Sequence, residues 1–185
     1  MLTTRLVRGF SLINLLVVVV VIVVLFVGAA LLLAALGRAR SNARQLYDGG
    51  QIRGIHQGMV LWAENNGGLY PLPSRIDLND ETVADQGRAK DTTANIFSIL
   101  IYNNFFSPEI CVGMAEANPS ISVHNTYSFA EPATAVTPKK ALWDPAFSAD
   151  FRGGKTGNFS YGHMVPANER LEKTWKNTYN DEQAV

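Results

Sequence analysis

The chain has 185 residues, enough for one modest globular domain beside a long apolar segment. Its formal net charge is zero, but no charged residue lies between Arg8 and Arg38. All sixteen acidic residues and fourteen of the sixteen basic residues lie at or after Arg38, so that part of the chain is slightly acidic. This balance argues against a nucleic-acid-binding protein, which usually presents a strongly basic face.

The uncharged segment, residues 10–37, predicts a helix that spans a membrane. Its core reads LLVVVVVIVVLFVGAALLLAAL, and a bilayer needs about 20 apolar residues in a helix. The run of valines would favour a buried strand in water, but an isolated strand in lipid leaves its backbone groups unpaired. A cleaved secretory signal peptide has a shorter apolar region of roughly 7–15 residues. An uncleaved signal anchor is the more serious alternative.

The segment MLTTRLVRGFSLINLLVVVVVIVVLF resembles the N-terminal cleavage and methylation motif of type IV prepilins and type II secretion pseudopilins. Residues 1–9 correspond to the leader, in which Arg5 and Arg8 are basic. The resemblance implies that a prepilin peptidase cuts between Gly9 and Phe10 and methylates the new amine of Phe10. It also implies a single-pass protein of the inner (cytoplasmic) membrane with its globular domain outside the cytoplasm. The flanking arginines alone do not settle this orientation.

The next stretch, ALGRARSNARQLYDGGQIRGIHQGMVLWAENNGGLYPLPS, resembles the segment that follows the anchor in a planctomycete-like pseudopilin family. Later segments resemble that family's variable domain more weakly. The resemblance implies a structural subunit of a type II secretion pseudopilus or of a type IV-like pilus. Its implied partners are the prepilin peptidase, other pilin or pseudopilin subunits and the inner membrane.

Asn14 departs from the family pattern, which usually has a glutamate at this position. That carboxylate is thought to neutralise the N-terminal amine of a neighbouring subunit during assembly, and a carboxylate in lipid is costly unless it is paired. Asn14 can form hydrogen bonds but carries no charge. Its presence is consistent with a minor, tip or initiating subunit, or with drift in a degenerate family member.

Residues 38–64 are expected to continue the helix as an amphipathic segment. The apolar positions recur at three- and four-residue spacing: Ile52, Ile55, Met59 and Trp62. One face of the helix should therefore pack on the globular domain.

Glycines interrupt this segment, and each weakens a helix by up to about 1 kcal/mol. A bend is expected near Gly49 and Gly50, while Gly50, Gly54 and Gly58 lie four residues apart and would admit a close neighbour. The sequence ENNGGLYPLPS should end the helix.

Residues 65–185 are expected to form an extracytoplasmic pilin-like domain. Residues 93–106 predict a second helix with a threonine cap, and residues 122–129 and 158–165 predict strands from their period-two pattern. The expected fold class is α+β: a long N-terminal membrane-spanning helix that continues into a small domain with an antiparallel sheet. The last residues, 171–185, are polar around two aromatic side chains. They carry no recognisable end signal, so a truncated gene product is one interpretation of this C-terminus.

The sequence contains no constellation that predicts catalysis, a metal centre or a cofactor. Cys111 is the single cysteine, for which a buried, inert thiol is favoured over an interchain disulfide. The three histidines, at positions 56, 124 and 163, show no metal-ligand spacing.

Two weaker patterns have structural explanations beside functional ones. The acidic loop Asp77, Asp80, Glu81 and Asp85 is interpreted as solvated rather than as a calcium site. A sugar site is a second hypothesis, but aromatic residues of this kind usually belong to a core. Its residues would be Trp143, Asp144, Asp150 and Tyr161.

Two rival functions remain beside the filament subunit. One is an uncleaved membrane-anchored extracytoplasmic binding protein for polysaccharide or protein. The other is an extracytoplasmic enzyme, which we do not expect because no catalytic group of residues is recognisable.

Overall fold

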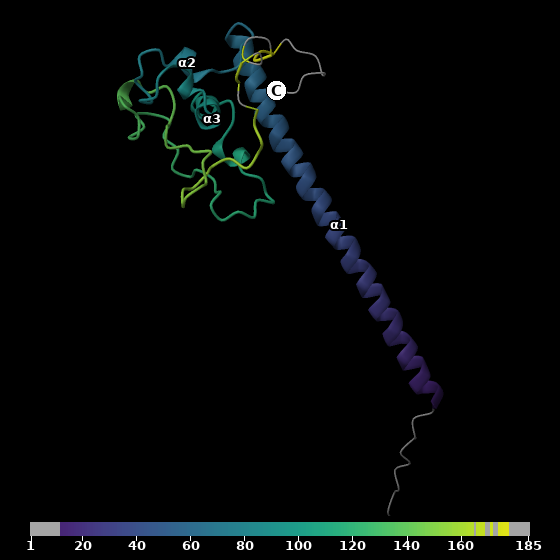
Figure 1. Cartoon of the computed structure of the whole chain (residues 1–185). Helices are drawn as coiled ribbons and strands as arrows, with labels where there is room; N and C mark the ends of the chain where they lie inside the picture. Colours follow the sequence, from purple (N-terminus) through teal and green to yellow (C-terminus); the bar gives the residue numbers. More distant parts are fainter. Residues whose placement is uncertain (1–11, 165, 169–170, 172–173, 178–185) are drawn as a thin grey trace, which may run out of the picture. The chain divides into compact units, whose positions relative to one another are not determined.

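The structure, a computed structural model, describes residues 12–164, 166–168, 171 and 174–177. The chain divides into two compact units, Met1–Gln45 and Leu46–Val185. Helix α1, Leu12–Asn65, is one continuous helix that begins in the first unit and ends in the second (Figure 1). The predicted bend at Gly49 and Gly50 does not interrupt its hydrogen bonding.

In the described part of the first unit, the large apolar side chains of α1 are exposed. The large apolar residues from Leu12 to Leu36 are 45–84% exposed. The most apolar 18-residue window has a mean hydropathy of 3.5, and none of it is buried. A core helix of a water-soluble domain would be mostly buried, so this segment is consistent with a single transmembrane helix.

In the second unit, one face of α1 packs into the globular core. The buried residues on this face are Gln51, Ile55, Gly58, Met59 and Ala63. Their spacing follows the helical period, which confirms the predicted amphipathic face at Ile55 and Met59. Ile52 was expected on the same face, but it is 51% exposed.

Helix α3, Thr93–Tyr102, is the central helix of the globular core, and every residue from Asn95 to Ile101 is buried. Side chains from the segments outside these two helices complete this core: Tyr70, Leu72, Cys111, Phe147, Phe159, Leu171 and Trp175. The remaining elements are short: α2 Pro73–Ile76, η1 Gly87–Lys90, η2 Pro108–Cys111 and η3 Pro138–Lys140.

Local sequence sets the end of α1 and the start of α3. Gly67 and Gly68 have φ values of 65° and 81°, and the amide of Gly68 donates to the carbonyl of Ala63 at 2.7 Å. Since glycine adopts positive φ at little cost, this pair ends α1 as predicted. Helix α3 is capped by Thr92, whose hydroxyl accepts from the amide of Asn95 at 3.2 Å.

The predicted antiparallel sheet is wrong. Strands were expected at 122–129 and 158–165, of which residue 165 lies outside the described residues. Within the described residues there is no strand, and only an isolated parallel bridge, between Ile121 and Gly157, forms next to these segments. A second isolated bridge, antiparallel, joins Leu69 to Lys176. The described chain is therefore helical with irregular loops, not α+β.

Side chains explain why no ladder forms between the two segments. The amide nitrogen of the Asn158 side chain donates to the carbonyl of Ser122 at 2.9 Å, and the carboxylate of Asp144 accepts from the backbone amide of Ser128 at 2.8 Å. These groups satisfy backbone positions that a neighbouring strand would otherwise occupy. Period-two apolarity alone did not reveal this competition.

Candidate functional site

Of the residues predicted from the prepilin resemblance, Asn14 lies among the described residues, and the cleavage-site residues do not. Gly9 and Phe10 lie outside the described residues. Asn14 lies in the first turn of α1, and its side chain is exposed. The candidate functional feature of this region is therefore the apolar helix as a whole.

Three exposed arginines follow the apolar part of α1: Arg38, Arg40 and Arg44. Among the described residues, none of the three forms an ion pair. The first acidic residue of the entire sequence is Asp48, so the arginines have no opposite charge before it. The helix thus changes from an uncharged segment to one with three arginines over about two turns.

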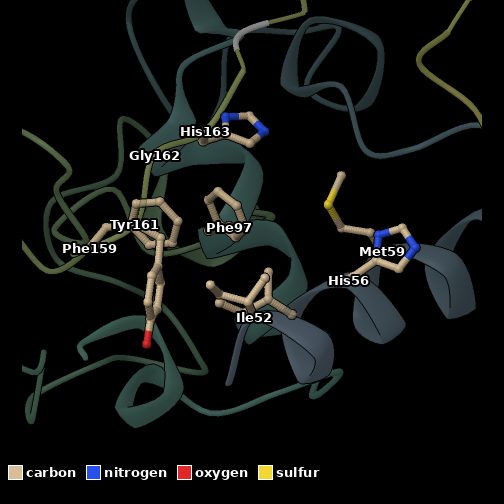
Figure 2. Close-up of a pocket in the computed structure, with 9 residues that line it drawn as sticks. Ile52, His56, Met59, Phe97, Phe159, Tyr161, Gly162 and His163 are labelled. Carbon is tan, nitrogen blue, oxygen red and sulfur yellow. The ribbon is translucent and has the colours of Figure 1, made fainter. Parts of the chain in front are cut away.

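In the globular unit, a cavity of about 200 Å³ lies between α1, α3 and the segment 159–163. Figure 2 shows Phe97 and Tyr161 on one side of it and the α1 residues Ile52 and Met59 on the other. Its lining is mainly apolar, with two imidazoles among the side chains. Such a composition suits a small apolar group rather than a charged one.

His163 lines this cavity and has a shifted pKa. Its Nδ1 lies 3.2 Å from the hydroxyl oxygen of Thr93, and its ring packs edge-to-face on Phe97 and Trp175. Burial lowers the pKa of His163 to about 4, and its buried Nε2 has no hydrogen-bond partner among the described residues. The imidazole is therefore neutral at physiological pH.

A cluster of polar groups holds α1 where its packed part begins, at Asp48 and Gln51. The hydroxyl of Tyr161 donates to Oε1 of Gln51 at 2.6 Å, and Nε2 of Gln51 donates to the carbonyls of Glu109 and Val112, both at 3.3 Å. The backbone amide of Met114 donates to the Asp48 carboxylate at 3.1 Å. Burial, together with the charge of Asp48, raises the pKa of Tyr161 to about 12, so the phenol remains a donor.

The acidic loop binds a buried cation, Lys90, which is the last residue of η1. Lys90 is 1% exposed, and its Nζ lies 3.0 Å from Oδ2 of Asp77 and 2.5 Å from Oδ1 of Asp80. Nζ also donates to the backbone carbonyl of Asp77. The interpretation of a fully solvated loop is wrong at Asp77, which is 3% exposed.

Hydrogen bonds hold this ion pair charged despite its burial. Burial raises the pKa of Asp77, but the Lys90 ammonium and the amides of Glu81, Thr82 and Val83 outweigh it and lower the pKa overall. No group of three or more potential metal-ligating side chains occurs in the described part of the chain. Sequence reasoning missed Lys90 because nothing in the spacing marks a lysine that folds back on a loop.

Three other sequence candidates are buried: Trp143, Asp144 and Cys111. Trp143 is fully buried, and its indole nitrogen donates to Asn95 at 3.1 Å, while Asp144 accepts from the amides of Ser128 and Ala146. These contacts confirm the interpretation of Trp143 as a core residue. Cys111 is fully buried, and burial together with the charge of Glu109 raises its pKa to about 12, as expected for an inert thiol.

Comparison with known proteins adds no relative. A scan against protein-family models, a search of curated proteins and a search of solved structures each found no match to this chain.

Proposed function

We propose that the chain is a membrane-anchored structural subunit of a pilin-like filament, made as a prepilin. The observation that carries the proposal is the exposed apolar part of α1, which continues without interruption into the helix that packs in the globular unit. Such a helix needs lipid before assembly and the equivalent helices of other subunits afterwards. The filament would belong to a type II secretion system or to a type IV-like pilus.

The charge distribution supports transfer of this helix out of the membrane. Cleavage between Gly9 and Phe10 would remove Arg5 and Arg8, the two charged side chains that precede the apolar segment. The mature helix would then carry no charged side chain before Arg38. Because moving an arginine through hydrocarbon is costly, the mature chain could leave towards the side of Arg38 with the amine of Phe10 as the single charge to pass through the membrane.

Asn14 bears on the kind of subunit. It is an exposed, uncharged residue in the first turn of α1, where the prepilin motif usually has glutamate. We include a minor or tip subunit in the proposal because Asn14 cannot neutralise a neighbouring amine by charge.

The N-terminus of the protein isolated from membranes tests the proposal. Mass spectrometry should find a chain that begins at Phe10 with one methyl group on its amine. A Gly9→Val variant should retain its leader, while a Ser41→Val variant provides a control outside the cleavage site. A wild-type chain that keeps Met1 would overturn the prepilin assignment.

An uncleaved, membrane-anchored binding protein is the second candidate function. The specific observation in its favour is the cavity of about 200 Å³, lined by α1 and the segment 159–163. The same mass spectrum separates the two functions, because only the filament subunit requires removal of residues 1–9.

A further inference from the structure

The arginines that follow the apolar segment form an exposed cationic region with no partner in the described structure. Arg38, Arg40 and Arg44 are all exposed, and Gly37 separates the first of them from the last leucine of the apolar run. A region of three exposed cations without opposite charge attracts anions from its surroundings.

Helix geometry places these arginines near the level of lipid phosphates. At 1.5 Å per residue, Arg38 lies about 39 Å and Arg44 about 48 Å along α1 from Leu12. The hydrocarbon core is about 30 Å thick, and each headgroup region adds roughly 5–8 Å. A tilt of the helix shortens these depths, and the long side chains extend back towards the membrane.

The three side chains also surround the helix rather than form a single stripe. At about 100° per residue, Arg40 and Arg44 lie about 40° apart on one face, and Arg38 lies roughly 120–160° around the axis from them. Several lipid headgroups can therefore approach at once. A guanidinium can bind two phosphate oxygens simultaneously, which favours phosphate over other anions.

We propose that Arg38, Arg40 and Arg44 bind the phosphate groups of anionic phospholipids in the leaflet where the apolar segment ends. The inference rests on the membrane insertion that the proposed function requires. Phospholipid is the favoured source of phosphate because the adjoining apolar helix holds the arginines at the headgroup layer, whereas free phosphate has no such confinement. Each arginine near an anionic surface contributes about fivefold in affinity at low salt.

The test uses the full chain reconstituted in phosphatidylcholine vesicles. Spin-labelled phosphatidylglycerol and phosphatidylcholine, added in parallel, report by electron paramagnetic resonance which lipid contacts the protein. We expect wild type to select phosphatidylglycerol several-fold. The triple variant Arg38→Gln, Arg40→Gln and Arg44→Gln should bring that selectivity close to one, and the corresponding triple lysine variant should retain most of it.

A charge-matched control removes three exposed cations from the globular unit: Lys139→Gln, Lys140→Gln and Arg152→Gln. This variant should keep the wild-type selectivity, because those residues lie about 100 or more positions after the apolar segment in the chain. Equal selectivity in the wild type and in the arginine-to-glutamine variant would overturn the inference. So would a loss of selectivity of the same size in the control.

Two further arms identify the source of the phosphate and separate the two proposals. Sodium phosphate and sodium chloride of equal ionic strength should weaken selectivity equally; a much larger effect of phosphate would assign the arginines to free phosphate instead. Insertion into pure phosphatidylcholine without selectivity would contradict this inference alone. Failure of the wild type to insert at all would contradict the membrane anchor in the proposed function.

Discussion

Tyr161 donates a hydrogen bond of 2.6 Å to Gln51, a residue 110 positions earlier in the chain. Gln51 is 7% exposed and also donates to two carbonyls of the segment 109–112. The amide of Gln51 therefore joins α1 to two separate loops of the globular unit. We expect Tyr161→Phe to lower the free energy of unfolding by about 1–2 kcal/mol, because it leaves a buried acceptor without this donor.

Urea unfolding in mild detergent, followed by tryptophan fluorescence, measures this effect, since all three tryptophans lie in the globular unit. Tyr102→Phe, at a partly exposed position of α3, is the matched control. A change below about 0.3 kcal/mol for Tyr161→Phe would show that this hydrogen bond contributes little.

Gly58 permits close approach between α1 and the loop that follows α3. A Cβ atom at this position would lie 2.6 Å from Cδ1 and 3.0 Å from Cε1 of Phe106. We expect Gly58→Ala to destabilise the globular unit by about 1–2 kcal/mol, because the ring must move from its packed position.

Gly49→Ala is the opposite case on the same helix. No atom lies within 4 Å of the position its Cβ would take, so alanine should stabilise α1 by up to about 1 kcal/mol. The difference in melting temperature between the two variants measures the packing effect. Equal stabilisation by both substitutions would contradict the close contact at Phe106.

Lys90 neutralises the buried carboxylate of Asp77. We expect Lys90→Met to destabilise the globular unit by about 3–5 kcal/mol, because it leaves Asp77 charged and unpaired in a buried site. Lys139→Met, at an exposed position, should change stability by less than about 0.5 kcal/mol. Chemical denaturation of the two variants checks the prediction, which fails if they are equally stable.

His163 should make the globular unit sensitive to acid. Its pKa in the folded state is about 4, below the ordinary value of 6.5, so the unfolded chain takes up the proton first as pH falls. The stabilisation is complete above about pH 6.5 and is lost progressively towards pH 4, to a total of at most about 3 kcal/mol.

The pH dependence of urea unfolding between pH 7 and pH 4 measures the contribution of His163. His163→Phe preserves an aromatic ring beside Phe97 and Trp175 and should flatten this part of the profile. The Tyr102→Phe variant, at a partly exposed position of α3, should follow the wild-type profile. A His163→Phe profile as steep as that of wild type would assign the acid sensitivity to other groups.

Local sequence signals predicted the helices because each depends on residues close together. Uninterrupted apolarity predicted the first part of α1, and the Gly67–Gly68 pair predicted its end. The helix expected at 93–106 ends at Tyr102, where Asn103 and Asn104 leave the helical path.

Long-range side-chain contacts were not predictable from the same signals. Asn158 and Asp144 bind backbone groups that the strand prediction had assigned to a sheet. Lys90 reaches Asp77 across 13 positions, and Tyr161 reaches Gln51 across 110. No periodic pattern marks such pairs, so the structure was needed to find them.

The central claim is that the apolar part of α1 must be covered, by lipid or by other copies of the same helix. Sedimentation of the full-length protein after detergent removal tests this claim most directly. Without lipid we expect large assemblies, and with phosphatidylcholine vesicles we expect the protein to float with the lipid. A freely soluble monomer without detergent or lipid would contradict both the membrane anchor and the filament subunit.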